Sequence, residues 1–167
     1  MIGLGKKSKK TSNTNINKTA AKKVETKKAA AKKPEPRKRI TIEDVDAMKP
    51  RPGFENLVAE LYRAKGYEAY VTPEHDKGVD VVAKKGKDVY TIQVKHSKDG
   101  NYSIDVSAIQ EVVAGMAVYK CNRSIAVTNQ FFSKTAQQVA LANKTQLIDR
   151  GTLIKELASY NRKVTKS

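Results

Sequence analysis

The sequence has little cysteine, few aromatic residues and no long apolar run. Cys121 is the single cysteine among 167 residues, so neither an internal disulfide nor a thiolate metal cluster can form, and this fits a reducing compartment. Aromatic residues make up 6% of the chain, which argues against sequence-specific reading of RNA by stacking. No apolar segment reaches the roughly 20 residues of a membrane-spanning helix. The apolar start, Met1–Leu4, is too short for a secretory signal. We therefore expect no membrane association and a cytoplasmic location in a bacterium, archaeon or phage.

Acidic residues are scarce as well, above all near the N-terminus. The net charge is +16, and residues 1–39 carry 14 Lys and Arg against only Glu25 and Glu35. Residues 40–167 are nearly balanced, with 19 basic and 15 acidic residues. Such a charged arm predicts a polyanionic partner, DNA or RNA, and the alternative interpretation is a solvated tail that keeps the protein soluble. The basic side chains of the arm that we assign to nucleic-acid binding are Lys22, Lys23, Lys27, Lys28, Lys32, Lys33, Arg37, Lys38 and Arg39.

Composition divides the chain into three parts. Residues 1–39 lack large apolar residues at a helical period, so they cannot bury enough surface to offset the entropy of ordering, and we expect a disordered basic arm and linker. Residues 40–160 have the composition of a globular domain, and residues 161–167 form a basic C-terminal tail. In a eukaryotic cell the arm could serve instead as a nuclear signal at 32–39 or as a mitochondrial presequence.

The apolar pattern of the globular part predicts an α/β fold. A short helix capped by Thr41 comes first, and further helices are expected over 54–65, 104–119, 133–143 and 151–160. Strands are expected over 67–72, 78–83, 89–95, 124–128 and 146–149. The first three strands can form an antiparallel meander, whereas the last two arrive through helices and should pair in parallel. We therefore predict a central mixed sheet of about five strands with helices on both faces.

Three polar residues in two neighbouring predicted strands can form a reaction centre. Gln93 and Lys95 are two residues apart, so their side chains share one face, and the hairpin can bring Asp80 to that face. Carboxylate and amide oxygens can hold Mg²⁺, and an ammonium group can position water or stabilise charge during phosphodiester hydrolysis. The same side chains are also compatible with a strand-end acceptor, a mid-strand amide and a lysine that reaches solvent. Spacing alone does not decide between these two interpretations.

Several longer motifs occur in a fixed order around these three residues. They are Gly53-Phe54-Glu55, Gly66-Tyr67, His75-Asp76-Lys77-Gly78-Val79-Asp80, Gln93-Val94-Lys95, Ala126-Val127-Thr128-Asn129, Phe131-Phe132 and Leu147-Ile148-Asp149. This ordered set resembles the catalytic domain of Mrr-type restriction endonucleases, which belong to the PD-(D/E)xK nuclease superfamily. The resemblance covers about 53–158 and implies a restriction-endonuclease-like core. It also implies a metal-dependent DNA endonuclease, which places an Mrr-like nuclease domain at 40–160.

The resemblance implies a role for each matching residue. Asp80 matches the metal-binding aspartate, and Lys95 matches the catalytic lysine. Gln93 matches the variable acidic position, which is commonly glutamine in Mrr-like proteins. Glu55 matches a helix glutamate that often joins the site, although an exposed carboxylate near a helix N-terminus is an equally good interpretation. The expected cofactor is Mg²⁺, with Mn²⁺ as a substitute. Asp80 and Gln93 are the expected metal ligands, and Glu55 is a candidate for a third.

The chain also departs from the family pattern. Because Gln93 is neutral, metal affinity should be weaker than with glutamate, and Asp76 or Glu55 can supply the missing charge. His75 and His96 border the motifs, and we assign His96 to DNA binding, with a loop histidine of no special role as the alternative. Full-length Mrr proteins carry a separate DNA-reading domain, whereas a short arm stands in its place here. Recognition of modified DNA is therefore not supported.

The leading hypothesis is a magnesium-dependent DNA endonuclease whose basic arm adds non-specific affinity for DNA. A second is a resolvase of Holliday junctions or other branched DNA, since archaeal resolvases share the core, although they usually carry Glu-x-Lys. A third is a non-catalytic DNA-binding protein that retains the nuclease fold. A homodimer would provide one site for each DNA strand, but the sequence shows no interface.

Overall fold

The computed structural model describes residues 39–165, except 74–77, 99 and 101. The predicted DNA-binding residues from Lys22 to Lys38 lie outside the described residues, as do His75 and Asp76. Arg39, the last residue of the basic arm, is exposed. The elements in chain order are α1 (Ile42–Ala47), η1 (Pro50–Phe54), α2 (Glu55–Ala64), β1 (Glu68–Val71), β2 (Val81–Lys85), β3 (Asp88–Lys95), β4 (Ser103–Ile104), α3 (Ser107–Val118), β5 (Arg123–Thr128), β6 (Phe131–Phe132), α4 (Lys134–Ala142), β7 (Gln146–Ile148) and α5 (Arg150–Val164).

A five-stranded mixed sheet forms the centre of the domain, as the sequence predicted. Its strand order is β1-β2-β3-β5-β7. The first three strands are antiparallel neighbours, and β3, β5 and β7 run parallel. The two parallel strands arrive through α3 and α4, because a parallel partner needs a crossover connection. This confirms the predicted α/β class.

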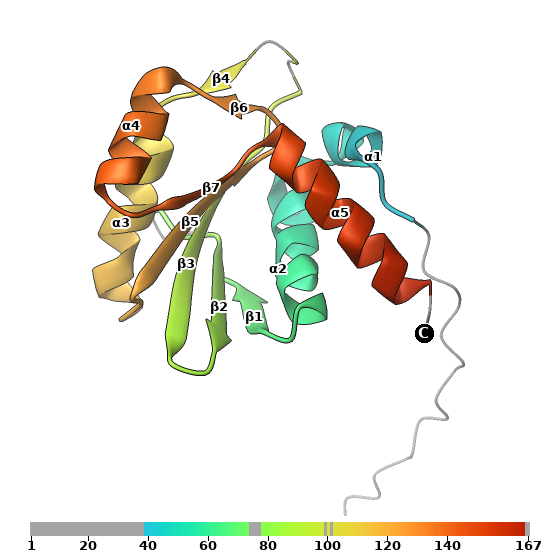
Figure 1. The fold of residues 1–167 in the computed structure, drawn as a ribbon, viewed down its shortest axis with the longest axis horizontal. Helices are drawn as coiled ribbons and strands as arrows, with labels where there is room; N and C mark the ends of the chain where they lie inside the picture. The colour runs from blue at the N-terminus through green and yellow to red at the C-terminus, as the bar shows by residue number, and fades with distance from the viewer. Residues whose placement is uncertain (1–38, 74–77, 99, 101, 166–167) are drawn as a thin grey trace, which may run out of the picture. The chain divides into compact units, whose positions relative to one another are not determined.

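Helices cover both faces of this sheet (Figure 1). On one face α2 and α5 pack over a core that includes Leu57, Ile92 and Leu153. On the other face α3 and α4 enclose a smaller core around Ile109 and Ala136. Burial of these side chains is the main stabilising contribution, at about 25 cal/mol per Å² of apolar surface. The strands that carry the candidate residues therefore run between two packed layers.

Contacts with α1 and α5 fix the start of the described chain at Ile40 and Thr41. Thr41 caps α1 through the predicted capping box with Asp44. The Asn161 side chain, in the C-terminal half of α5, exchanges two hydrogen bonds with the backbone of Ile40, at 3.0 and 2.8 Å. Helix α5 reaches Val164, four residues beyond its predicted end at 160, because Asn161 is buried in this contact. The first residues of the segment that we assigned to a basic tail are thus helical.

Three elements were not predicted. The first is the short η1 segment, Pro50–Phe54, which directly precedes α2. Strands β4 and β6 are two residues each, and they pair in parallel as a separate small sheet. Their hydrophobic pattern is too short to distinguish a strand from a loop. The remaining differences are shifts of element ends, such as α3 beginning at Ser107 rather than at 104. Within the described part of the chain, none of the helices is both long enough and apolar enough to span a membrane.

Candidate active site

The structure places Asp80 directly before β2 and attaches it to the middle of β3. The backbone N–H of Asp80 donates to the carbonyl of Ile92 at 2.9 Å. Its carboxylate Oδ2 accepts a hydrogen bond of 2.7 Å from the backbone N–H of Val94, the residue between Gln93 and Lys95. Asp80 is 8% exposed and Gln93 is 6% exposed. The hairpin thus brings Asp80 to the segment that carries the other two residues of the motif.

Alternate side chains of strand β3 point toward helix α3. The Thr91 hydroxyl donates to the carbonyl of Val112 in α3 at 3.3 Å, and Lys95 Nζ donates to Oε2 of Glu111 in α3 at 2.5 Å. Gln93 lies between these two positions in the alternation and so belongs to the same face. The predicted common orientation of Gln93 and Lys95 agrees with this geometry.

Glu111 is a site residue that sequence reasoning missed. It is the single acidic residue of α3, and its carboxylate forms an ion pair with Lys95. Its charge also contributes to raising the pKa of Asp80, which places Glu111 within electrostatic reach of that carboxylate. The available signal was a carboxylate in the middle of the predicted helix, which carries no other charge apart from Asp105 at its start. Only the packing of α3 on β3 shows which lysine it meets.

Arg51 is the second residue that sequence reasoning missed. Its Nη2 donates to Asp80 Oδ1 at 2.8 Å, and its Nε donates to Glu55 Oε1 at 3.2 Å. One guanidinium therefore joins the predicted helix glutamate to the predicted metal-binding aspartate. Arg51 stands between Pro50 and Pro52, outside the motifs that the sequence analysis identified. Glu55 is buried at the start of α2, so the alternative of an exposed helix carboxylate is wrong.

Burial dominates the electrostatics of the two carboxylates. It raises the pKa of Asp80, while the Val94 N–H and the charges of Arg51 and Lys95 act in the opposite direction. Burial also raises the pKa of Glu55, and the nearby Asp80 charge adds to this increase. The negative charge of Asp80 thus disfavours ionisation of Glu55, and a cation bound near both carboxylates would offset this cost.

Two buried oxygens near Asp80 show whether the residues present could hold a metal ion. Glu55 Oε2 and Gln93 Oε1 are buried and have no hydrogen-bond partner, an arrangement that costs about 1–3 kcal/mol for each group. The described residues contain no cluster of three or more His, Cys, Asp or Glu side chains that could hold a metal ion. Mg²⁺, however, uses one or two carboxylates and keeps several waters. Two carboxylates and one amide oxygen therefore fit Mg²⁺ better than a metal that needs a full set of protein ligands.

His96, the residue after β3, contacts α1 and η1. Its Nε2 is 2.8 Å from the carbonyl oxygen of Val45 in α1, and its ring packs edge-on against Phe54 with 5.7 Å between ring centroids. These contacts tie β3 to α1 and η1. The assignment of His96 to DNA binding stays a prediction.

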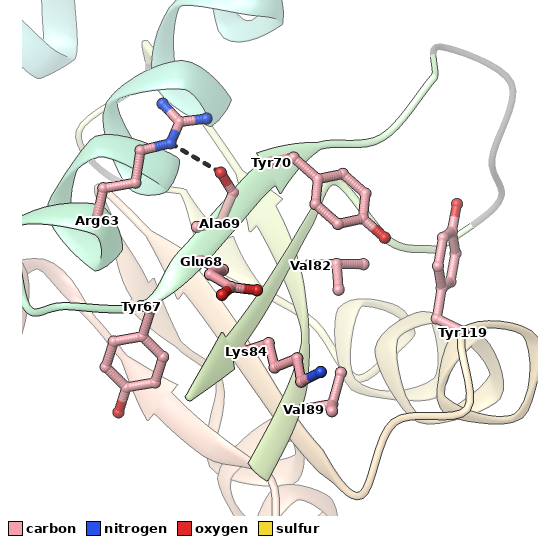
Figure 2. A pocket seen from close by; sticks show the side chains of 9 residues that line it. All are labelled: Arg63, Tyr67, Glu68, Ala69, Tyr70, Val82, Lys84, Val89 and Tyr119. Atoms are coloured by element: carbon pink, nitrogen blue, oxygen red, sulfur yellow. Dashed lines mark hydrogen bonds between the residues drawn. The ribbon is translucent and has the colours of Figure 1, made fainter. Parts of the chain in front are cut away.

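A cavity of about 540 Å³ lies over β1 and β2, away from the motif. Figure 2 shows it, with Arg63 donating a hydrogen bond of 2.7 Å to the carbonyl of Ala69. The lining residues are Arg63, Tyr67, Glu68, Ala69, Tyr70, Val82, Lys84, Val89 and Tyr119. None of them is a candidate catalytic residue, so the cavity lies outside the candidate site.

Solved structures with a similar fold include restriction endonucleases. The DNA modification-dependent restriction endonuclease AspBHI matches with a TM-score of 0.56 and 14% identity, over 75% of this chain and 38% of that chain. The restriction endonuclease MspJI, solved in complex with a 27-mer oligonucleotide, matches with a TM-score of 0.52 and 20% identity, over 75% and 34%. A protein of unknown function, AF1548, matches with a TM-score of 0.51 and 19% identity, over 57% and 56%. At these identities the likeness shows the fold alone, and this chain spans between 34% and 56% of those chains.

The sequence itself matches a family model. A search of curated proteins finds no match. The family model described as "Restriction endonuclease", Mrr_cat, matches residues 45–157, which is more than half of the chain. This match agrees with the structural neighbours and confirms the predicted resemblance. The chain belongs to the Mrr_cat restriction endonuclease family.

Proposed function

We propose that the protein is a metal-dependent DNA endonuclease in which Asp80, Gln93, Lys95 and Glu55 form the reaction centre. The observation that carries the proposal is the joining of Asp80 to β3 between Gln93 and Lys95, beside two buried oxygens without partners. Asp80 and Gln93 would hold Mg²⁺, with Glu55 as a further oxygen ligand. The bound cation would polarise the scissile phosphate and lower the pKa of an attacking water.

The chain's own residues would orient the substrate and stabilise charge. Lys95 projects from the end of β3, and Glu111 holds its ammonium group at 2.5 Å. This pair fixes the direction of Lys95, so that it can donate to the phosphate or to the water that attacks it. The burial of Asp80 and Gln93 limits access of bulk water to the oxygens that would hold the cation. The basic arm would add sequence-independent affinity for DNA that falls steeply with salt.

Incubation of the full chain with supercoiled plasmid tests the proposal. We expect conversion to nicked or linear DNA with Mg²⁺ or Mn²⁺, loss of cutting after removal of the metal with EDTA, and recovery when Mg²⁺ is restored. The rate should also fall as salt rises. Cutting no greater than that of an Asp80→Ala control would rule out the endonuclease. Cutting of four-way junctions and of linear duplex, measured side by side, distinguishes a general endonuclease from a branched-DNA resolvase. A resolvase would cut the junction faster.

The neutral side chain of Gln93 leads us to a separate prediction about the affinity of the site for Mg²⁺. Gln93→Glu adds a third carboxylate to the site, so we expect Mg²⁺ affinity to rise by about tenfold, or about 1.4 kcal/mol. Without metal the variant should be less stable by about 1–2 kcal/mol, because the new charge is buried beside another carboxylate. Calorimetric titration with Mg²⁺ and urea denaturation measure the two effects.

Gln138→Glu is the matched control, since it makes the same chemical change on the exposed face of α4. It should leave both the metal affinity and the free energy of unfolding within about 0.5 kcal/mol of the wild type. Equal metal affinity in Gln93→Glu and in this control would show that Gln93 does not contact the cation.

A further inference from the structure

Arg51 provides a positive charge at the carboxylates that the proposed function assigns to the metal. Its guanidinium bonds to Asp80 Oδ1 at 2.8 Å and to Glu55 Oε1 at 3.2 Å. The side chain of Arg51 is 27% exposed, against 12% for Asp80 and 7% for Glu55. The guanidinium therefore lies at the more solvent-accessible side of the two carboxylates.

The backbone of Arg51 is restricted by its neighbours, whereas its side chain has several rotatable bonds. Arg51 stands between Pro50 and Pro52 with φ −127° and ψ 134°, and a residue before proline is restricted to such extended conformations. The following residues lead directly into α2, whose first residue is Glu55. Rotations of the long side chain are thus the simplest way for the guanidinium to leave the carboxylates without moving its Cα.

Both oxygens of Asp80 already have donors. Oδ2 accepts from the backbone N–H of Val94 at 2.7 Å, and Oδ1 accepts from Arg51. The backbone donor is part of the β3 framework, whereas the side-chain donor can be replaced. A divalent cation on Asp80 would need Oδ1, and its charge would repel a guanidinium at the same oxygen. Arg51 and the cation therefore compete for one position.

We propose that Arg51 pairs with Asp80 and Glu55 in the DNA-free protein and moves to a DNA phosphate when the cation binds. The inference rests on the proposed function, which supplies both the cation and the DNA. A planar guanidinium matches phosphate by paired hydrogen bonds as well as it matches carboxylate. DNA would withdraw Arg51 from the carboxylates and so favour cation binding, and by reciprocity the cation would favour DNA binding. Arg51 thereby couples occupancy of the metal site to the presence of substrate.

Calorimetric titration of the DNA-free, full-length chain with Mn²⁺ tests the competition. Arg51→Gln should bind Mn²⁺ at least about fivefold more tightly than the wild type, the lower end of a typical coupling effect, and should cut plasmid more slowly. Arg123→Gln is the matched control, because it removes a positive charge from a more exposed pair with Asp88. The control should keep the wild-type Mn²⁺ affinity. A purely structural Arg51 would instead give equal or weaker Mn²⁺ binding in Arg51→Gln, and that result would overturn the inference.

A second measurement keeps the inference testable if Arg51→Gln does not fold. In a Lys95→Met chain, which should not cut, Mn²⁺ affinity is measured with and without a short DNA duplex. We expect tighter binding with the duplex, and equal affinity in the two titrations would overturn the coupling. The two proposals fail differently. If no chain binds Mn²⁺, the metal-dependent function fails as well, whereas Mn²⁺ binding unaffected by Arg51 or DNA removes only the role of Arg51.

Discussion

Replacing Asp80 with asparagine should abolish plasmid nicking and weaken metal binding while leaving the domain folded. Asparagine keeps the size of the side chain but removes the negative charge that a hard cation requires. Metal catalysis contributes several kcal/mol to such reactions, and a loss of about 4 kcal/mol corresponds to a rate reduction of about 10³-fold. Quantified plasmid nicking and calorimetric titration with Mg²⁺ measure the two losses.

The stability of this variant distinguishes a functional residue from a structural one. Burial raises the pKa of Asp80 in the folded protein, so any stability gained from its titration is present at low pH and is lost as the pH rises through the folded pKa. At neutral pH the buried charge is therefore a cost, which asparagine removes. Asparagine also weakens the contact with Arg51. We expect the opposing effects to leave the free energy of unfolding within about 1 kcal/mol of the wild type.

The matched control for this prediction is Asp88→Asn, the same change at the start of β3. Asp88 lies at the hairpin turn and pairs with Arg123 at 3.4 Å. This variant should nick plasmid at the wild-type rate. A pH series adds a second check, since protonation removes a ligand and metal affinity should fall as the pH is lowered through the raised pKa of Asp80. Nicking by Asp80→Asn at the rate of Asp88→Asn would refute the assignment of Asp80 to the reaction centre.

The order of the main elements could be predicted because local patterns determine it. The apolar runs at 89–95 and 124–128 correspond to β3 and β5, and the hydroxyls of Thr41 and Ser133 cap α1 and α4 as expected. The shared face of Gln93 and Lys95 follows from the two-residue period of a strand. These features need no knowledge of which helix covers which face.

The contacts around the triad could not be predicted because tertiary packing determines them. Arg51 and Glu55 are four residues apart, but the bond from Arg51 to Asp80 spans 29 residues. The pair of Lys95 and Glu111 spans 16 residues and depends on how α3 crosses β3. Hydrophobic periodicity gives the buried side of a helix, but it does not give the partner of an individual charge. The neutral Gln93 was visible in the sequence, whereas its unpaired oxygen emerges only from the packed site.

A substitution at Gly78, two residues before the candidate aspartate Asp80, should have a large effect on stability. Gly78 has a φ of +83°, and a Cβ there would lie 2.5 Å from the carbonyl oxygen of Glu111 and 2.9 Å from its carbonyl carbon. The neighbouring contact is equally tight, because a Cβ on Gly115 of α3 would lie 2.1 Å from Val79 Cγ2. Helix α3 therefore rests on this segment at two adjacent points, where the backbone of Glu111 meets Gly78 and where Gly115 meets the side chain of Val79. An alanine at position 78 would have to push the helix away from the segment before β2 that carries Asp80.

Gly78→Ala should accordingly lower the free energy of unfolding by about 3 kcal/mol or more. Left-handed backbone costs alanine about 1–2 kcal/mol, and a clash in packed structure adds about 1–3 kcal/mol. Gly86→Ala is the matched control, because Gly86 also has a positive φ, +61°, but a Cβ there meets nothing within 4 Å. Urea denaturation of both variants separates the backbone cost from the steric cost. Equal destabilisation would mean that α3 does not press on Gly78. A larger loss in Gly78→Ala, together with weaker metal binding in the fraction that remains folded, would show that this contact also places Asp80, because displacement of α3 moves Glu111 and Asp80 together.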